Sequence, residues 1–179
     1  MRKLLIVVDM QNDFIDGALK NPAAEVIVKL LCQKIADWDG DIIATLDTHK
    51  SNYMSTREGK YLPIPHCING TDGHQLNKHI EAALVAAQNK GTRVTIVPKP
   101  TFGSTALPGI IKHMYYDYIE LDGTCTSICV ISNAIILKSA FPETDIAVDA
   151  ACCACLNDET HNAALTVMKT CQIDILNWK

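Results

Sequence analysis

Short apolar segments alternate with longer amphipathic segments along this chain, and this alternation limits the fold more than any other feature. The first apolar segment, KLLIVVD at residues 3–9, is hydrophobic without a polar residue at every second position. A strand of this kind is buried on both faces, as in a parallel sheet covered by helices. We predict strands at residues 3–9, 41–47, 92–98, 116–121 and 144–149, and a shorter strand near 173–176. We predict helices at about 22–38, 72–89, 104–113, 126–140 and 158–170.

The order of these elements indicates the fold class. Because strands and helices alternate, we expect an α/β protein with three layers, α-β-α, and a mainly parallel six-stranded sheet in the middle. A chain of 179 residues has the usual length of one domain and can bury most of its apolar surface. We therefore expect a single domain over residues 1–179.

Charge and hydropathy argue against several classes of partner. Sixteen Lys and Arg residues against twenty Asp and Glu residues give a net charge of −4, which disfavours binding to nucleic acid or to an anionic membrane. The apolar segment after Lys3 has only five residues before Asp9 and no cleavage site, unlike a signal peptide. No segment reaches the roughly 18 apolar residues of a membrane-spanning helix. We expect a soluble cytoplasmic protein whose partner is a small molecule.

Cysteine is frequent. Eight cysteines occur, at positions 32, 67, 125, 129, 152, 153, 155 and 171. A chain of this length, rich in aliphatic residues, does not need disulfides to fold, so we expect most of them to be reduced and buried. Cys152, Cys153 and Cys155 follow a predicted strand among small residues, where free cysteine packs as a compact hydrophobic side chain. The alternative for this group is metal binding or redox chemistry, although it lacks the second cysteine pair of a zinc finger.

Reactive side chains gather where predicted strands end. Asp9 closes the first strand, Asp47 and His49 lie at the end of the second, and Lys99 follows the third. The segment 123–129 follows the fourth strand. Open α/β sheets bind ligands outside the carboxyl ends of their strands. We therefore expect these segments to meet at one edge of the sheet and to form the functional site.

The residues around Cys129 suggest a nucleophile. Cys129 lies in the first turn of a predicted helix whose N-cap is Thr126 or Ser127. A helix N-terminus lowers the pKa of a thiol and offers N–H groups to an oxyanion. Asp9 ends an apolar strand and needs a partner, and Lys99 is available to hold it charged and to favour the thiolate. The alternatives are a packing cysteine and an ordinary ion pair.

A second set of residues suggests a metal site. Asp47 and His49 are two positions apart at a strand end, and His66 and Glu58 lie in the unusually long connection 49–73. Connections of this length usually carry function. Three such ligands with open positions suit catalytic Zn²⁺ or a similar divalent cation. The alternative is that these histidines are solvated.

Three motifs together resemble those of a known family. They are VVDMQNDF, PKPTFGS and GTCTSICV, which contain Asp9, Lys99 and Cys129. Over essentially its full length the chain resembles the isochorismatase-like cysteine hydrolases, and among them most of all the nicotinamidases. The resemblance implies that these three residues form a catalytic triad, with Cys129 as the nucleophile and Asp9 as the acid. It also implies that Phe14 and Phe102 contact the substrate ring.

The resemblance has further implications for the nucleophile segment. It implies an oxyanion hole made by the N–H groups of Cys125 and Cys129, and a cis peptide bond between Thr124 and Cys125. Ser127 stands where the family usually has an aspartate, and the segment 61–66 (YLPIPH) lacks a common tryptophan. These departures bear on the identity of the substrate more than on the type of reaction.

The metal segments of nicotinamidases are matched as well. DTHKSNY and PHCINGTDG resemble them, which implies that Asp47, His49 and His66 bind a divalent metal and that Glu58 is a candidate fourth ligand. Zinc is the expected metal, with iron or manganese as alternatives. In these relatives the cation orients the pyridine nitrogen of the substrate. Members of the family often form dimers or larger assemblies, so we expect a homo-oligomer.

The sequence therefore predicts hydrolysis of nicotinamide to nicotinate and ammonia through a cysteine thioester. One alternative is a related cysteine hydrolase that acts on another small amide, ureido or vinyl-ether compound and needs no cation. The alternative from a different class is a non-catalytic metal-binding or thiol-redox protein that uses the histidines and the cysteine group.

Overall fold

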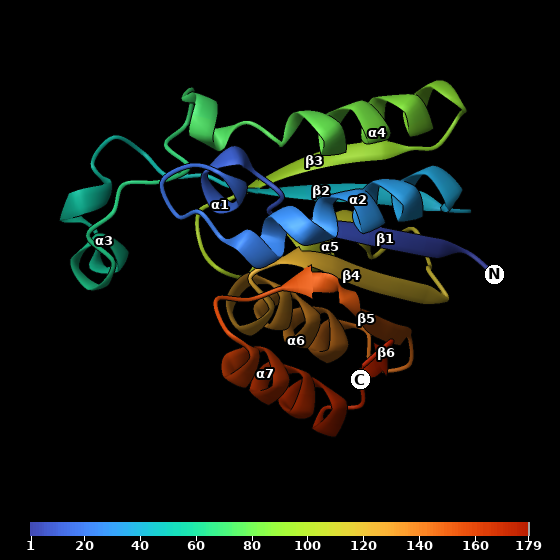
Figure 1. Ribbon diagram of the computed structural model, residues 1–179. Helices are drawn as coiled ribbons and strands as arrows, with labels where there is room; N and C mark the ends of the chain where they lie inside the picture. Colours follow the sequence, from blue (N-terminus) through green and yellow to red (C-terminus); the bar gives the residue numbers. More distant parts are fainter. Residues whose placement is uncertain (179) are drawn as a thin grey trace.

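Six strands form one parallel sheet in the order β3-β2-β1-β4-β5-β6 (Figure 1). This is a computed structural model, which describes residues 1–178. The strands are β1 (Lys3–Val8), β2 (Asp41–Asp47), β3 (Val94–Lys99), β4 (Tyr118–Thr124), β5 (Asp145–Ala154) and β6 (Asp174–Leu176). The α-helices are α1 (Asn12–Ile15), α2 (Pro22–Asp37), α3 (Arg57–Tyr61), α4 (Lys78–Asn89), α5 (Leu107–Ile111), α6 (Ile131–Ala140) and α7 (Asp158–Thr170). The predicted α/β fold with a six-stranded parallel sheet is confirmed.

Side chains of β1 alternate between two hydrophobic clusters. Leu4, Ile6 and Val8 pack with residues of α5, α6 and α7, whereas Leu5 and Val7 pack with residues of α2 and α4. Successive residues of a strand point to opposite faces of the sheet, so a strand covered on both sides must be apolar at every position. Figure 1 shows α2 and α4 together on one face and α6 and α7 on the other.

The connection from β2 to α4 is the longest in the chain. It contains α3 and two short 3-10 turns, Tyr53–Ser55 and Asp72–His74. In Figure 1 the part that carries α3 projects from the body of the molecule, at the end of the sheet opposite the N-terminus. Because β1 starts at the N-terminus, this is the end at which the parallel strands finish. Within residues 1–178, every helix is too short or too polar to span a bilayer.

Some predicted boundaries were wrong. Of the helix predicted at 72–89, only the part from Lys78 is α-helical, because Asn77 caps it by accepting a hydrogen bond from the His79 N–H (3.0 Å). The helix predicted at 104–113 is limited to α5. Strand β5 continues to Ala154, well past the predicted end at residue 149, after an irregularity in its pairing with β4. Cys152 and Cys153 therefore lie within a strand and do not follow one.

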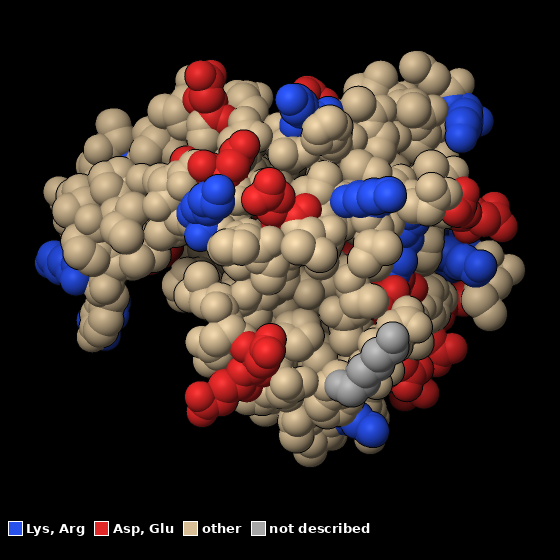
Figure 2. All heavy atoms as spheres, in the orientation of Figure 1, with Lys and Arg blue, Asp and Glu red and all other residues tan. Residues whose placement is uncertain are grey.

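Charged side chains are distributed over the surface and also buried under α2. On the face seen in Figure 2, basic and acidic side chains are interspersed. Beneath α2, the Lys34 ammonium contacts Glu120 and lies 3.0 Å from Asp122 Oδ2 and 2.6 Å from Asp149 Oδ2. Asp122 is fully buried, and burial, only partly offset by Lys34, raises the pKa of this carboxyl group to about 8. One lysine thus faces three acids in the interior.

The raised pKa of Asp122 predicts a pH-dependent contribution to stability. The folded state binds this proton more tightly than the unfolded state, so the free energy of unfolding should fall as pH rises from about 4 to about 8, by at most about 1.4 kcal/mol per pH unit. Asp122→Asn should remove this contribution. Urea unfolding of both proteins at pH 5 and pH 8 checks it: a difference in stability between them that does not change with pH would contradict the assignment.

Candidate active site

Four chain segments meet at the carboxyl edge of the sheet, because the strands that carry them are neighbours. Val8 at the end of β1 is in register with Thr45 of β2 and Gly123 of β4, and Asp47 of β2 is in register with Lys99 of β3. Asp9 follows Val8 with a φ of 51°, a left-handed conformation that is uncommon outside glycine. The side chains at these positions are therefore brought together, as the strand ends predicted.

Asp9, Lys99 and Cys129 form one buried group. Lys99 Nζ lies 2.6 Å from Asp9 Oδ2 and donates a hydrogen bond to Cys129 Sγ at 3.5 Å. The Thr45 hydroxyl donates to Asp9 Oδ1 at 2.7 Å and fixes the carboxylate. Asp9 and Lys99 are fully buried and Cys129 is 6% exposed. The three residues that the motifs singled out are thus in contact.

The electrostatics of this group differ from the sequence prediction. Burial raises the pKa of the Cys129 thiol well above its usual value, and Asp9 adds to this, while Lys99 acts in the opposite direction. Burial also raises the pKa of Asp9, against the influence of Lys99. Burial lowers the pKa of Lys99, but Asp9, Cys129 and Asp47 outweigh it, so this pKa lies above its usual range. Burial and Asp9 thus oppose the thiolate that Lys99 was predicted to favour, and the thiol lies beside a proton acceptor.

The segment that carries Cys129 is not the N-terminus of an ordinary α-helix. Thr126–Val130 form a π-helical turn, η3, that leads into α6, and neither Thr126 nor Ser127 caps a helix. The Thr126 hydroxyl instead donates to the Ala154 carbonyl at 2.9 Å, which ties the turn to β5. The peptide bond between Thr124 and Cys125 is cis, as predicted.

The four predicted metal ligands also converge. Ligand atoms of Asp47, His49, Glu58 and His66 all lie within 4.8 Å of one another. Asp47 Oδ2 lies 2.8 Å from His49 Nε2 and 3.5 Å from His66 Nε2, and Glu58 Oε1 lies 3.5 Å and 3.8 Å from the same two nitrogens. His66 Nδ1 lies 2.8 Å from the carbonyl of Ile64, so this nitrogen donates and Nε2 is left to bind a metal.

These donors fit a divalent cation. His49 Nε2 is buried and, although close to Asp47, has no hydrogen-bond partner among the described residues. Burial opposes ionisation of Asp47, but His49, His66 and Lys99 outweigh it and hold the pKa of this carboxyl group below its usual range. Two imidazoles and two carboxylates that face one point are a donor set suited to Zn²⁺, iron or manganese.

Asp47 joins the two groups. Its Oδ1 lies 3.4 Å from Lys99 Nζ, while its Oδ2 faces the two histidines. The Gln11 side chain holds the Asp47 backbone from both sides, because its Nε2 donates to the Asp47 carbonyl at 2.9 Å and its Oε1 accepts from the Asp47 N–H at 2.7 Å. Sequence reasoning did not single out Gln11, although it lies in the VVDMQNDF motif, two residues after Asp9.

Two further residues that sequence reasoning missed support the site. Asn133 of α6 donates from Nδ2 to the Cys129 carbonyl at 2.7 Å, and its Oδ1 accepts from the Ser104 N–H at 2.8 Å. Asn133 follows Cys129 by four residues, and this spacing was the signal in the sequence that could have indicated its contact with Cys129. The Tyr53 ring lies 4.8 Å from the His49 ring and 5.0 Å from the His66 ring, between centroids. Tyr53 thus supports both imidazoles of the metal group.

The two predicted ring-contacting residues lie in different places. The Phe14 ring is 5.6 Å from the His66 ring, between centroids, and it lines a cavity of about 410 Å³ together with Cys125 and Ile128. Phe102 is half exposed and lines a separate groove beside Ile131 of α6. The structure therefore brings Phe14, but not Phe102, to the cavity next to the nucleophile segment.

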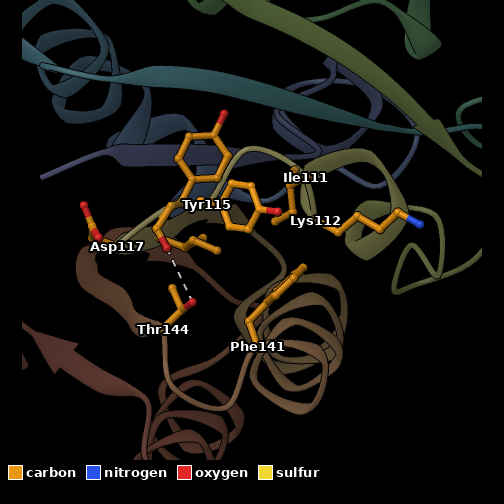
Figure 3. Close-up of a pocket in the computed structure, with 8 residues that line it drawn as sticks. Ile111, Lys112, Tyr115, Asp117, Phe141 and Thr144 are labelled. Atoms are coloured by element: carbon orange, nitrogen blue, oxygen red, sulfur yellow. Dashed lines mark hydrogen bonds between the residues drawn. The ribbon is translucent and has the colours of Figure 1, made fainter.

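A different cavity lies at the opposite end of the sheet. It has a volume of about 230 Å³ and is shown in Figure 3, where Phe141 and Thr144 lie near Tyr115 and Asp117. The Thr144 hydroxyl donates to the carbonyl of Tyr116 at 3.4 Å. These residues flank the starts of β4 and β5, whereas Cys129 follows the end of β4. This cavity is remote from the triad and the metal ligands.

The parallel six-stranded sheet with a buried acid, lysine and thiol at its carboxyl edge places the chain in the α/β class of proteins. The chain belongs to the isochorismatase family, since the family model described as isochorismatase domain matches residues 3–179.

Individual relatives are similar over most of their length. An uncharacterized isochorismatase family protein, PncA, of Bacillus subtilis is 31% identical over 75% of this chain and 78% of its own. The nicotinamidase of Saccharomyces cerevisiae is 27% identical over 82% of this chain and 86% of its own. The crystal structure of a pyrazinamidase/nicotinamidase from Streptococcus mutans superposes with a TM-score of 0.83 and 29% identity, covering 97% of this chain and 99% of that one.

Proposed function

We propose that this protein hydrolyses nicotinamide to nicotinate and ammonia through a thioester at Cys129. The observation that carries the proposal is the position of Lys99, which lies within 3.5 Å of Asp9, Cys129 and Asp47. A nucleophile and a metal group that share one lysine can act on two parts of the same small substrate. Relatives named as nicotinamidases support this substrate class.

The reaction begins with transfer of the Cys129 thiol proton to the Asp9 carboxylate as the sulfur attacks the amide carbon. Lys99 keeps Asp9 ionised in the free enzyme, and the raised pKa of Asp9 makes it an effective proton carrier. The N–H groups of Cys125 and Cys129 hold the oxyanion of the tetrahedral intermediate. The C–N bond then breaks, the leaving nitrogen takes the proton from Asp9, and ammonia departs.

Water completes the cycle. Asp9, again ionised, takes a proton from a water molecule that attacks the thioester, and the sulfur leaves with that proton as nicotinate is released. Asp47, His49, Glu58 and His66 would hold a divalent cation, which when bound supplies a Lewis-acidic anchor for the pyridine nitrogen. Phe14 lies against His66 and provides an apolar contact for the ring.

Ammonia release from nicotinamide, pyrazinamide and benzamide tests the proposal. Benzamide has the shape of nicotinamide but lacks the ring nitrogen, so it should be a much poorer substrate if the ring is held through that atom. Equal turnover of benzamide and nicotinamide, independent of metal, would favour a general small-amide hydrolase. Absence of turnover with all three amides in metal-loaded protein would exclude the proposal and favour a non-catalytic role.

Removal of a metal ligand should separate metal binding from the nucleophile. We expect His49→Ala to lower the metal content of the purified protein and to reduce kcat/KM on nicotinamide by about 10- to 100-fold, in line with losses seen when a metal's supporting groups are removed. Alkylation of Cys129 by iodoacetamide should be retained, because His49 does not contact the triad. Metal content by mass spectrometry and peptide mapping measure the two effects.

His74→Ala provides the matched control. His74 is also a buried histidine in the same connection, but its Nε2 lies 2.9 Å from the Thr48 hydroxyl and it is not part of the metal group. Equal loss of metal in the two variants would show that the His49 result reflects general disturbance of the connection.

A further inference from the structure

Cys125 and Cys155 lie side by side at the ends of two neighbouring strands. Thr124 of β4 is in register with Ala154 of β5, and each of the two cysteines is the next residue along its strand. Adjacent strands in a sheet are about 4.8 Å apart, and disulfides join Cα atoms about 4.4–6.8 Å apart. The two sulfur atoms are 3.1 Å apart, and both thiols are free. The sulfur atoms are thus about 1 Å farther apart than in a disulfide bond.

The surroundings of the two thiols are unequal. Cys155 Sγ lies 3.1 Å from the Ser127 hydroxyl and 3.3 Å from the Thr160 hydroxyl. Burial opposes ionisation of Cys155, but these hydroxyls and Cys125 outweigh it and lower the pKa of Cys155 to about 7. Burial raises the pKa of Cys125 to about 11, and Cys155 adds to this. Cys155 is therefore the thiol that ionises first, and Cys125 is the neutral neighbour that stabilises it.

One member of the pair, Cys125, lines the cavity beside the nucleophile segment. Cys125 and Leu156, the residue after Cys155, both line the cavity of about 410 Å³ that also contains Phe14. The other cysteines of the 152–155 group differ from Cys155. Cys153 belongs to the hydrophobic cluster under α6 and α7, and Cys152 lies beside Lys34 and Asp122. Cys155 is the member of this group that lies against another thiol, that of Cys125, which lines the cavity.

We propose that Cys125 and Cys155 are a redox-active dithiol that a small hydroperoxide converts into a disulfide at the wall of the active site. The Cys155 thiolate attacks the O–O bond of the hydroperoxide; an S–O bond forms, the O–O bond breaks, and the leaving hydroxide or alkoxide takes up the proton that Cys155 released on ionising and departs as water or an alcohol. The Cys125 sulfur then attacks the Cys155 sulfenic acid, an S–S bond forms, the S–O bond breaks, and water leaves with the Cys125 proton. Two thiols are oxidised and one peroxide is reduced.

The disulfide also has a consequence for catalysis, and this part rests on the proposed function. To form the bond, the sulfur atoms must approach by about 1 Å from their present separation of 3.1 Å. Cys125 is the residue whose N–H we assign to the oxyanion, so the part of this approach that the Cys125 backbone takes up moves the donor from its required position. A misplacement of about 1 Å is expected to lower turnover on the order of 100-fold. Reduction of the disulfide by a dithiol should restore the activity.

Peptide mapping tests the disulfide without any substrate. The full-length protein is treated with increasing hydrogen peroxide, free thiols are alkylated, and the digest is analysed by mass spectrometry with and without dithiothreitol. We expect a Cys125–Cys155 cross-linked peptide that dithiothreitol abolishes, formed before the exposed Cys171 is oxidised. The proposal is overturned if Cys125 and Cys155 stay unlinked while Cys171 is oxidised, or if either forms its principal cross-link with another cysteine.

Two serine variants connect the disulfide to activity. Cys155→Ser keeps a polar group near Ser127 and Thr160 but cannot form the disulfide. Peroxide should therefore lower the nicotinamidase activity of this variant by less than about twofold. The same treatment should lower the activity of the unmodified chain on the order of 100-fold. Cys152→Ser, a change three residues earlier in β5, should stay as sensitive as the unmodified chain. If peroxide inactivates Cys155→Ser as strongly as the unmodified chain, the proposed effect of the disulfide on turnover is refuted. If the protein releases no ammonia at all, the proposed function fails, while the peptide map still decides the dithiol.

Discussion

Cys129→Ala is expected to lower ammonia release from nicotinamide by about 10⁴- to 10⁶-fold, the loss seen when the nucleophile of a hydrolase is removed. The sulfur is the only atom that the substitution removes, and it lies 3.5 Å from Lys99 Nζ beside Asp9. The loss should appear in kcat with metal content unchanged, because Cys129 does not belong to the metal group. Steady-state kinetics and metal analysis of the same preparation measure both quantities.

Cys153→Ala is the matched control for this substitution. Cys129 and Cys153 are both almost fully buried in the same hydrophobic cluster, so the two changes should have similar costs in stability, on the order of 1 kcal/mol. Only the change at Cys129 should abolish turnover. A Cys129→Ala protein that keeps more than a tenth of the activity would refute the assignment of Cys129 as the nucleophile. The alternative of a packing cysteine would then hold.

Asp9→Asn is expected to lower turnover by about 10²- to 10⁴-fold, the usual contribution of a general acid-base group. Asparagine has nearly the shape of aspartate but cannot take the thiol proton, and it leaves the buried Lys99 with Asp47 as its remaining anion. Removal of one partner from a buried ion pair should also lower the free energy of unfolding by about 3 kcal/mol. Alkylation of Cys129 by iodoacetamide should become slower, which reports the lost proton acceptor without any substrate.

Asp122→Asn separates the loss of the acid from the loss of a buried charge. Asp122 is equally buried and lies 3.0 Å from a lysine, but this lysine is Lys34 of α2 and not Lys99 of the triad. At neutral pH this variant should retain full turnover, although it too removes a buried carboxylate from the side of a lysine. Equal turnover in Asp9→Asn and the unmodified chain would exclude Asp9 as the proton carrier.

Strand patterns predicted most of the fold because burial on both faces leaves a clear local signal. KLLIVVD became β1, with its odd and even positions in two separate clusters. Strand boundaries that depend on pairing with a neighbouring strand could be predicted less well from the sequence. Strand β5 reaches Ala154 because it pairs with the end of β4 after an irregularity, and a segment of small residues such as AACCA carries no local sign of this.

The residues of the candidate site also divide into those that local patterns could place and those that depend on the tertiary structure. Asp9, Asp47 and Lys99 could be placed at one edge in advance, because all parallel strands finish there. The convergence of Glu58 and His66 on Asp47 depends on the path of the long connection, which no periodicity specifies; the family resemblance supplied it. The Thr126 hydroxyl was predicted as a helix cap but bonds to Ala154, since the tertiary structure offers a nearby carbonyl that a local pattern does not contain.

The sequence by itself determined that strands would be covered on both sides and that two acids, a lysine, a thiol and one histidine, His49, would come to the same edge, since these follow from local hydrophobicity and from the direction of parallel strands. The tertiary structure decided how burial, Asp9 and Lys99 act on the pKa of Cys129, and it decided the pairing of Cys125 with Cys155. Desolvation and hydrogen bonding act over a few ångströms and depend on atoms from distant segments, so these properties exist only once β1, β4 and β5 lie next to one another.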